Sequence, residues 1–580
     1  MLKALAIKAL PPTIIVFVVL SGSFLATPLA SSKLPACGYG YVGYGGTSAP
    51  TVTNVTPNSG STAGGTKVTI TGSGFCTATA VDFGSTAASS FVIISDTEMQ
   101  AVTPAEAAGT VDVTVTNAFG TSATSPADHF TFVVTQSTAK CITTQPKLTG
   151  SNGSTWVDMS AGLSATFTAG ATGYAILGGN ADLWTANTGF NQDMGIAVTG
   201  TGFPTSAGQP EAWKESGGFA GTFSPNAAFV QTVIPVTGGQ AYTARLVWKA
   251  NKADSGSIYA GAGPIGGRFS ETCVNFRLVT SLPSVVAKSS TTQYQLINSN
   301  GSAWQDMATT NLGLTFTPSA AGVILVSGNS DLWTSTKGFN QDIGISISGG
   351  GYPTTAGQPE TWKESGGFGG TFSPNAAFVQ GSFGVASGTT YTVKLQWKAN
   401  KAGTDTIYAG AGPINANFSP TKLTLLFLPA DSAAIEKVST SQYTLTSSNG
   451  STWQAVDTFT FTLSYTPVND CEVILGGNVD LFTGNAGFNQ DIGITVNDTS
   501  FPSSAGQPEG WKESGGFAGT FSPNAAYVQI TTQLSGGHTY TFNLVWKTNK
   551  PASGATIYAG AGPIAGKFSP TRLSLQPVGC

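Results

Sequence analysis

The chain has 580 residues, of which 9% are charged, and a formal net charge of −4. The length allows roughly four domains of ordinary size. The low share of charged residues, against about 25% in an average soluble protein, favours a chain that lies against a surface or assembles. The negative charge argues against nucleic acid as a partner. Gly is abundant at 74 residues and no helical periodicity is present, so the composition predicts short β-strands joined by tight turns.

The first 32 residues have the pattern of a signal peptide. Lys3 and Lys8 precede an apolar stretch at 13–27, and residues 30–32 are small enough for a cleavage site. An uncleaved membrane anchor is the alternative, although the apolar stretch is shorter than the roughly 20 residues that span a bilayer. No other segment of the sequence could span one. The sequence therefore predicts an extracellular protein, secreted or held at the cell surface.

Residues 33–48 form a Gly/Tyr-rich leader, and residues 49–135 form a separate domain. Apolar and polar residues alternate through several short runs of this domain, as at Val68 and Ile70 or at Val111, Val113 and Val115. Gly and Pro punctuate the runs. Many short strands with regular turn signals indicate a β-sandwich.

Several motifs of this domain resemble the IPT/TIG family. They are Pro-Asn-Ser-Gly at 57–60, Gly-Gly-Thr-Lys-Val-Thr-Ile at 64–70, Gly-Ser-Gly-Phe at 72–75, Val-Asp-Phe-Gly at 81–84, residues 109–115 and Asn-Ala-Phe-Gly at 117–120. The resemblance implies an immunoglobulin-like sandwich. It also implies a spacer or binding module, because such domains carry no catalytic residues to transfer.

The rest of the chain repeats one unit three times. Trp213, Trp362 and Trp511 each begin the sequence Trp-Lys-Glu-Ser-Gly-Gly-Phe, at a constant offset of 149 residues. Such self-similarity indicates tandem copies of one folding unit. We place the copies at 141–280, 290–429 and 439–580. They resemble repeats of uncharacterised bacterial secreted β-proteins, a likeness that implies no activity.

Each repeat is predicted to be an antiparallel β-sandwich similar to a jelly roll, so the whole chain is all-β. The clearest strand has Tyr391, Val393, Leu395 and Trp397 on one face and polar residues on the other. An Asn-Gly pair near the start of each repeat, as at 152–153, predicts a two-residue hairpin. Because the linkers between the repeats are short, we expect a semi-extended string of domains.

Six cysteines in an exported chain predict disulfide bonds. Two of them bracket the first repeat and two lie in the third, while the second repeat has none. The expected pairs are Cys37–Cys76, Cys141–Cys273 and Cys471–Cys580. Six cysteines allow 15 connectivities, so the sequence alone leaves the pairing open.

Motifs for catalysis are missing from the sequence. His129 and His538 are the only histidines, so no repeated Ser-His-Asp or Cys-His set can be built. Neither a His-Glu-x-x-His zinc motif nor a phosphate-binding loop is present. The sequence therefore predicts a protein that is not an enzyme, with no cofactor and no bound metal.

A polar set that recurs in every repeat is the candidate binding site. Its aromatic ring could stack on a sugar while its carboxylates and amides bind hydroxyl groups. The alternative is structural, with Asp and Asn capping turns and Lys–Glu pairs stabilising a loop. The set comprises Asp182, Asn191, Asp193, Trp213, Lys214 and Glu215; Asp331, Asn340, Asp342, Trp362, Lys363 and Glu364; and Asp480, Asn489, Asp491, Trp511, Lys512 and Glu513.

These observations predict a multivalent adhesion or binding protein whose partner is a polysaccharide or another surface polymer. Linked copies of a weak site raise the avidity for a repetitive target. Two alternatives stay open. One is a structural component of the envelope or an appendage, in which self-association would matter. The other is a secreted glycoside hydrolase, because pairs of carboxylates recur.

Overall fold

The structure is a computed structural model of the chain. It describes residues 48–578 apart from 63, 108, 134–136, 188, 217–224, 280–284, 337, 366–373, 431–433, 468–470, 486, 499–505 and 515–522. The predicted signal peptide, nearly all of the predicted leader, Cys37 and Cys580 lie outside the described residues. No helix of the described part is long and apolar enough to cross a membrane.

The N-terminal domain is a sandwich of two sheets. One sheet has the order β1-β3-β7-β6 and the other β2-β10-β8-β4-β5, with β9 paired to β8. Phe83, Phe130 and Phe132 pack edge to face between the sheets. The elements are β1 (Thr51–Thr56), β2 (Ser59–Ser61), β3 (Lys67–Ser73), η1 (Phe75–Thr77), β4 (Ala80–Phe83), β5 (Thr86–Ala87), β6 (Ser90–Ser95), β7 (Glu98–Val102), β8 (Gly109–Asn117), β9 (Gly120–Thr121), η2 (Pro126–Asp128) and β10 (His129–Val133).

The first repeat is also a sandwich, built from a six-stranded and a five-stranded sheet. The first has the order β11-β21-β15-β20-β12 with β18 paired to β15, and the second β13-β19-β16-β17 with β14 paired to β19. The strands are β11 (Ser137–Ile142), β12 (Lys147–Thr149), β13 (Val157–Asp158), β14 (Ser164–Thr168), β15 (Gly173–Thr185), β16 (Gln192–Gly200), β17 (Ala212–Ser216), β18 (Asn226–Val236), β19 (Ala241–Ala250), β20 (Ser257–Ala260) and β21 (Thr272–Val279).

The second and third repeats have the same strand order. The second contains β22 (Val285–Ser290), β23 (Tyr294–Ile297), β24 (Gln305–Asp306), β25 (Gly313–Phe316), β26 (Gly322–Thr334), β27 (Gln341–Ser348), β28 (Thr361–Ser365), β29 (Asn375–Val385), β30 (Tyr391–Ala399), β31 (Thr406–Ala409) and β32 (Thr421–Pro429). The third contains β33 (Ile435–Ser439), β34 (Tyr443–Thr446), β35 (Gln454–Ala455), β36 (Thr462–Tyr465), β37 (Cys471–Thr483), β38 (Gln490–Asn497), β39 (Gly510–Ser514), β40 (Asn524–Leu534), β41 (Tyr540–Thr548), β42 (Thr556–Ala559) and β43 (Thr571–Val578).

This strand order is that of a jelly roll. The first two strands of a repeat, β11 and β12, pair with the last two, β21 and β20, and most of the later connections cross from one sheet to the other. The connections β13–β14, β16–β17 and β20–β21 stay within one sheet. The all-β prediction is therefore confirmed. The alternation predicted for β30 is also observed, since Tyr391, Val393, Leu395 and Trp397 are all buried in the core between the two sheets.

The Asn-Gly hairpin prediction is wrong. The strands on either side of Asn152 and Gly153 belong to different sheets, because β12 pairs with β20 and β13 with β19. Asn152 Oδ1 instead accepts from the backbone N–H groups of Ser154 and Thr155, which closes a turn between the sheets. Gly153 has φ 74°, and a Cβ there would lie 2.4 Å from backbone atoms of Lys252 and Ala253.

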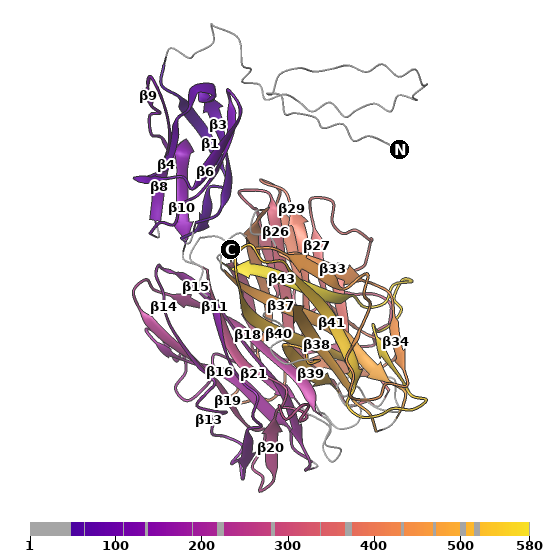
Figure 1. Cartoon of the computed structure of the whole chain (residues 1–580). Coiled ribbons are helices and arrows are strands. Elements are labelled where there is room, and N and C mark those ends of the chain that lie inside the picture. The colour runs from indigo at the N-terminus through magenta and orange to yellow at the C-terminus, as the bar shows by residue number, and fades with distance from the viewer. Residues whose placement is uncertain are drawn as a thin grey trace, which may run out of the picture.

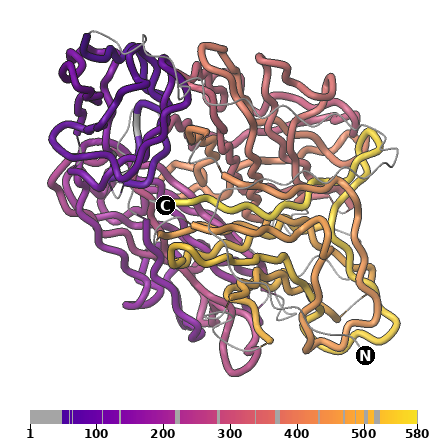
Figure 2. Tube along the Cα trace, turned by 45° about the horizontal axis from the view of Figure 1, so that its top comes forward, coloured from indigo at the N-terminus to yellow at the C-terminus, as the bar shows by residue number. Residues whose placement is uncertain are grey.

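The three repeats do not form the expected semi-extended string. They pack side by side around a common axis, and the N-terminal sandwich lies next to the first repeat (Figure 1; Figure 2). On the axis, the rings of Phe229, Phe378 and Tyr527 contact one another with centroids 4.5 to 4.7 Å apart. Asn226, Asn375 and Asn524 form a second layer, in which each side-chain amide donates to the next carbonyl around the ring. The repeats thus form a closed pseudo-trimer within one chain.

Candidate functional site: three composite repeat interfaces

The repeated Trp-Lys-Glu segment forms the contact between neighbouring repeats. Lys214 in β17 donates through Nζ to the carbonyl of Pro420 in the second repeat, and the N–H of Glu215 donates to Asp331 Oδ2 at 3.0 Å. Lys363 and Glu364 make the equivalent bonds to Pro570 and Asp480 in the third repeat. The sequence had no signal that this segment would meet another copy.

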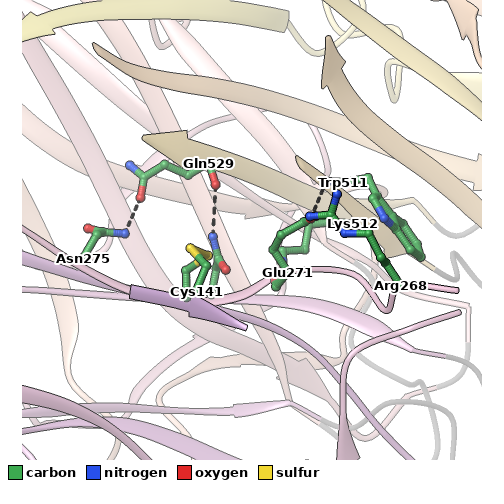
Figure 3. The surroundings of a disulfide bond; sticks show 9 residues. Cys141, Arg268, Glu271, Asn275, Trp511, Lys512 and Gln529 are labelled. Atoms are coloured by element: carbon green, nitrogen blue, oxygen red, sulfur yellow. Dashed lines mark hydrogen bonds and ion pairs between the residues drawn. A yellow bond between two sulfur atoms is a disulfide. The ribbon is translucent and has the colours of Figure 1, made fainter. Parts of the chain in front are cut away.

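The third interface closes the ring. The N–H of Glu513 donates to Asp182 Oδ2 of the first repeat at 3.0 Å, and Lys512 donates to the carbonyl of Glu271. Glu271 also accepts from the N–H of Trp511 at 2.9 Å (Figure 3). Each repeat therefore presents the same two surfaces, one to each neighbour, as in a cyclic trimer.

The repeated tryptophans are buried, which contradicts the exposure that ring stacking on a ligand at these positions requires. Trp213, Trp362 and Trp511 are only 5%, 6% and 4% exposed. Each indole packs on a glycine of the neighbouring repeat, where a Cβ on Gly412, Gly562 or Gly263 would lie 3.1 to 3.2 Å from the ring. Each of these tryptophans thus packs closely against the neighbouring repeat.

The rest of the predicted polar set is divided between neighbouring repeats. Asn191, Asp193 and Glu215 of one copy come together, and the Asp that joins them is Asp331 of the next copy. Asp182 of the first copy joins the set of the third. The set is thus brought together in the structure, but across an interface and not within one domain.

Burial controls the ionisation of these groups. Desolvation, and next the charge of Asp193, raise the pKa of Glu215 to about 8, although its Oε1 accepts from the amides of Asn191 and Asn251. Asp193 forms a buried ion pair with Lys249, whose ammonium lies 5.1 Å from the ring centroid of Trp156. At neutral pH Glu215 therefore carries its proton and can donate a hydrogen bond. Burial likewise raises the pKa of Glu364 and of Glu513 to about 8.

A cavity opens at the interface of the second and third repeats. It has a volume of about 510 Å³. Asp342, Glu364 and Asn400 of the second repeat line one side, and Phe482, Tyr558 and Pro563 of the third are among the residues on the other. The interface of the third and first repeats has a related cavity of about 360 Å³, lined by Glu513, Asn549, Trp184 and Pro264 among others. Each is therefore built by two repeats.

Sequence reasoning missed the aromatic wall of these cavities. Trp184 stacks on Tyr259 with ring centroids 4.2 Å apart and 13° between their planes. The same pair recurs as Trp333 and Tyr408 at 4.0 Å and as Phe482 and Tyr558 at 4.9 Å. Trp184 and Tyr259 are partly exposed. The repeated sequences Asp-Leu-(Trp/Phe)-Thr and Ile-Tyr-Ala-Gly-Ala-Gly-Pro carried the signal, since both occur in every copy.

Of the three predicted cysteine pairs, the one whose two residues are both described is confirmed. Cys141 in β11 and Cys273 in β21 form a disulfide (Figure 3). Cys76 and Cys471 are also disulfide-bonded. Because their expected partners Cys37 and Cys580 lie outside the described residues, these two pairings stay predictions.

One group of side chains in the described part of the chain has spacing suited to a cation. The ligand atoms of Asp112, Asp128 and His129 in the N-terminal domain lie within 4.8 Å of one another. One oxygen of Asp128 accepts from the N–H of Ser125 at the start of η2, and His129 Nε2 lies 3.3 Å from Asp112. Because these contacts serve the turn, the group by itself does not make a metal site.

Comparisons with known proteins give one assignment. A search of the curated proteins finds no match to this chain. One solved structure with some similarity is γ-CGTase from alkalophilic Bacillus clarkii, with 16% identity over 37% of this chain and 27% of that one and a TM-score of 0.15. Another is a surface glycan-binding protein, SGBP-B, from a xyloglucan utilization locus of Bacteroides uniformis, with 14% identity over 40% of this chain and 74% of that one and a TM-score of 0.14. A third is the tandem CBM22 domain of Xyn10C from Paenibacillus barcinonensis, with 10% identity over 49% of this chain and 91% of that one and a TM-score of 0.15.

These likenesses are too low to carry an argument about the repeats, and the chain spans about a quarter of the length of the γ-CGTase. The family model of the IPT/TIG domain matches residues 50–132. This range coincides with the two-sheet sandwich of β1 to β10 and with the motifs at 57–60 and 64–70. Residues 50–132 of this chain are an IPT/TIG domain.

Proposed function

We propose that this protein is an exported, non-enzymatic binding protein that engages a polysaccharide through sites at the interfaces between its repeats. The observation that carries the proposal is the composition of the two interface cavities. Each has a flat aromatic side chain on one wall and a Glu–Asn pair on the other. Sugars are bound in this way, with a C–H face on an aromatic ring and polar groups on the hydroxyls.

The proposal differs from the sequence interpretation in the ring that would stack on the ligand. Trp213, Trp362 and Trp511 are buried between repeats, so that role passes to the partly exposed rings of Trp184, Trp333 and Tyr558. Phe482 is itself only 8% exposed and supports Tyr558 by stacking on it. Asn191, Asp193 and Glu215 and their counterparts remain candidate binding residues. Asp182, Trp213, Lys214 and their counterparts would support the site by holding the two repeats together.

The chemistry of the cavity favours an uncharged glycan. Its carboxyl groups already repel one another, which contributes to the raised pKa of Glu364. An acidic sugar would bring a further negative charge next to them at an energetic cost. A neutral sugar can instead accept from the protonated Glu and use both faces of its ring.

Binding of fluorescent neutral polysaccharides to the full chain tests the proposal. Replacing Trp184, Trp333 and Tyr558 together by Ala should abolish binding, and replacing one of them should weaken it, since the remaining sites still provide avidity. Phe459→Ala is the matched control, because Phe459 is 93% exposed and contributes to neither cavity. Unchanged binding by the triple variant would contradict the proposal.

A structural role in the envelope or in an appendage is the second candidate. The observation that favours it is the use of the repeated Trp-Lys-Glu segment for packing between domains. Failure of every glycan to bind, together with assembly of the full chain into filaments or sheets, would support this role.

A further inference from the structure

A small cavity, lined by both apolar and polar side chains, lies on the axis around which the three repeats pack. Its volume is about 40 Å³, which is enough for a monatomic ion or a water molecule. Gln231, Gln380 and Gln529, which occupy the same position in the three copies, line it together with Phe229 of the axial aromatic cluster. The cavity therefore belongs to the assembled pseudo-trimer and to no single repeat.

One position of the lining breaks the threefold pattern. The first repeat has Arg277 where the second has Leu426 and the third has Gln576. Arg277 is 7% exposed, and its Nη1 donates to Gln576 Oε1 at 2.9 Å. Its Nε has no hydrogen-bond acceptor, and none of the ion pairs formed by the described residues includes this guanidinium.

Arg277 keeps its charge in this position. Burial lowers the pKa of its guanidinium to about 10, so the group stays protonated at neutral pH. A buried charge with no opposite charge nearby is strongly unfavourable. The interior of the pseudo-trimer thus has a positive charge beside a cavity, and no carboxylate of the described residues forms an ion pair with it; Glu472 is bonded to Ser137, the strand partner of Arg277.

The amides around the cavity are turned so that they present donors. Gln231 Oε1 accepts from Ser327 Oγ at 2.7 Å, and Gln529 Oε1 accepts from Asn275 Nδ2 at 2.7 Å (Figure 3). Gln380 Oε1 accepts from the hydroxyl of Tyr527 at 3.4 Å. Since these carbonyl oxygens are engaged by neighbours, the NH₂ groups of Gln231 and Gln380 are left to meet an occupant, whereas Gln529 Nε2 also donates to the hydroxyl of Tyr527 at 3.4 Å.

From this geometry we propose that the axial cavity binds one small monovalent anion, of the halide class, between Arg277 and the three glutamine amides. Asn275, Ser327 and Thr424 in the lining could accept from a water molecule, but a water would leave the positive charge of Arg277 without a counterion. The volume excludes phosphate or a sugar acid with its hydration shell. An anion here contacts all three repeats, so it stabilises the closed ring.

Bromide detects the site directly. Crystals of the full chain grown or soaked in bromide should show an anomalous peak on the pseudo-threefold axis next to Arg277, and Arg277→Gln, which installs the residue of the third repeat, should remove it. Arg245→Gln is the matched control, because Arg245 is a partly exposed arginine that already pairs with Asp158. Bromide at other positions only, or water in the cavity under these conditions, would overturn the proposal.

Thermal unfolding gives an independent measurement. Replacing gluconate by chloride at constant ionic strength should raise the unfolding midpoint of the wild type and of Arg245→Gln, because a ligand that binds only the folded state stabilises it. The Arg277→Gln variant should show no such shift. If this variant does not fold, Arg277→Lys retains the charge and should keep a chloride-dependent midpoint. An equal chloride effect in wild type and Arg277→Gln would contradict the proposal.

Discussion

Single residues at the interfaces decide how the repeats hold together. Trp362 shows this clearly, because its indole fills a space over Gly562 of the next repeat and is 6% exposed. A ring exposed for stacking on a sugar would contribute little to the core, and the fold would survive its loss. The indole is instead buried, and truncating a buried aromatic leaves a cavity.

Replacing Trp362 by Ala should therefore lower the free energy of unfolding by about 3–5 kcal/mol. Urea denaturation of the full chain measures the change. Trp333→Ala removes an indole that is partly exposed in the wall of an interface, and it should cost distinctly less. Equal losses of unfolding free energy in the two variants would show that burial of Trp362 between repeats stabilises the protein no more than a partly exposed indole does.

The buried carboxyl of Glu364 leads to a second prediction about a single residue. Burial raises its pKa from 4.5 in the unfolded chain to about 8 in the folded one, so between these values the folded state binds the additional proton. This group's contribution to stability is thus present below about pH 4.5 and is lost as the pH rises through about 8.

Glu364→Gln should consequently gain stability relative to the wild type as the pH rises from 5 to 8. The gain is at most about 1.4 kcal/mol per pH unit. Denaturant unfolding of both proteins at pH 5, 6.5 and 8 tests it. Glu98→Gln is the control, because Glu98 is exposed in β7 of the IPT/TIG domain. A constant difference between Glu364→Gln and wild type across this range would refute the assignment.

Among the elements, the edge strand β11 is held in two ways. It pairs with β21 from Ser137 to Ile142, and the disulfide between Cys141 and Cys273 links the same two strands. The equivalent edge strand of the second repeat, β22, has the pairing alone. The bridge is therefore an addition to a fold that forms without it.

Replacing both Cys141 and Cys273 by Ala should lower stability by about 4 kcal/mol in the chain-entropy model, because the bridge closes a long loop. The repeat should still fold, as the second repeat does without cysteine. Denaturation followed by circular dichroism reports the loss, and non-reducing peptide mapping checks the predicted Cys37–Cys76 and Cys471–Cys580 pairs. A Cys-free first repeat with random-coil circular dichroism would contradict this view.

At the scale of the whole molecule, the three repeats have the arrangement of a cyclic trimer within a single chain. Each repeat presents a Trp-Lys-Glu surface to one neighbour and a surface with an Asp and a Gly-Pro turn to the other. Because both surfaces exist on every copy, a single repeat is complementary to itself in the head-to-tail manner that closes a ring.

The isolated second repeat with its edge strand β22, residues 285–429, should accordingly fold and associate into a homotrimer. Sedimentation equilibrium distinguishes trimer from monomer. The same fragment with Trp362→Ala should remain folded but shift towards monomer, since the ring packs on a glycine of the neighbouring repeat. A folded wild-type fragment that stays monomeric at high concentration would show that covalent linkage of the copies is required.

The sequence by itself determined the all-β class, the IPT/TIG domain and the triplication, and it indicated the Cys141–Cys273 pair without fixing it. These depend on local signals, such as the alternation in β30 and the position of cysteines at the two ends of a repeat. The polar set around Glu215 could also be picked out, because it recurs in each copy. Periodicity of 2 fixes which face of a strand is buried, but it does not reveal what covers that face.

Only the tertiary structure decided the arrangement of the repeats and hence the roles of the residues that recur in every copy. Trp213 and Trp184 are both repeated aromatic residues in polar surroundings, and nothing local separates the buried one from the partly exposed one. The partner of Glu215 is Asp331, which lies 116 residues away in another domain. Contacts between domains depend on the fit of whole surfaces. A sequence pattern can indicate which residues share a surface, but it does not show which other surface they contact.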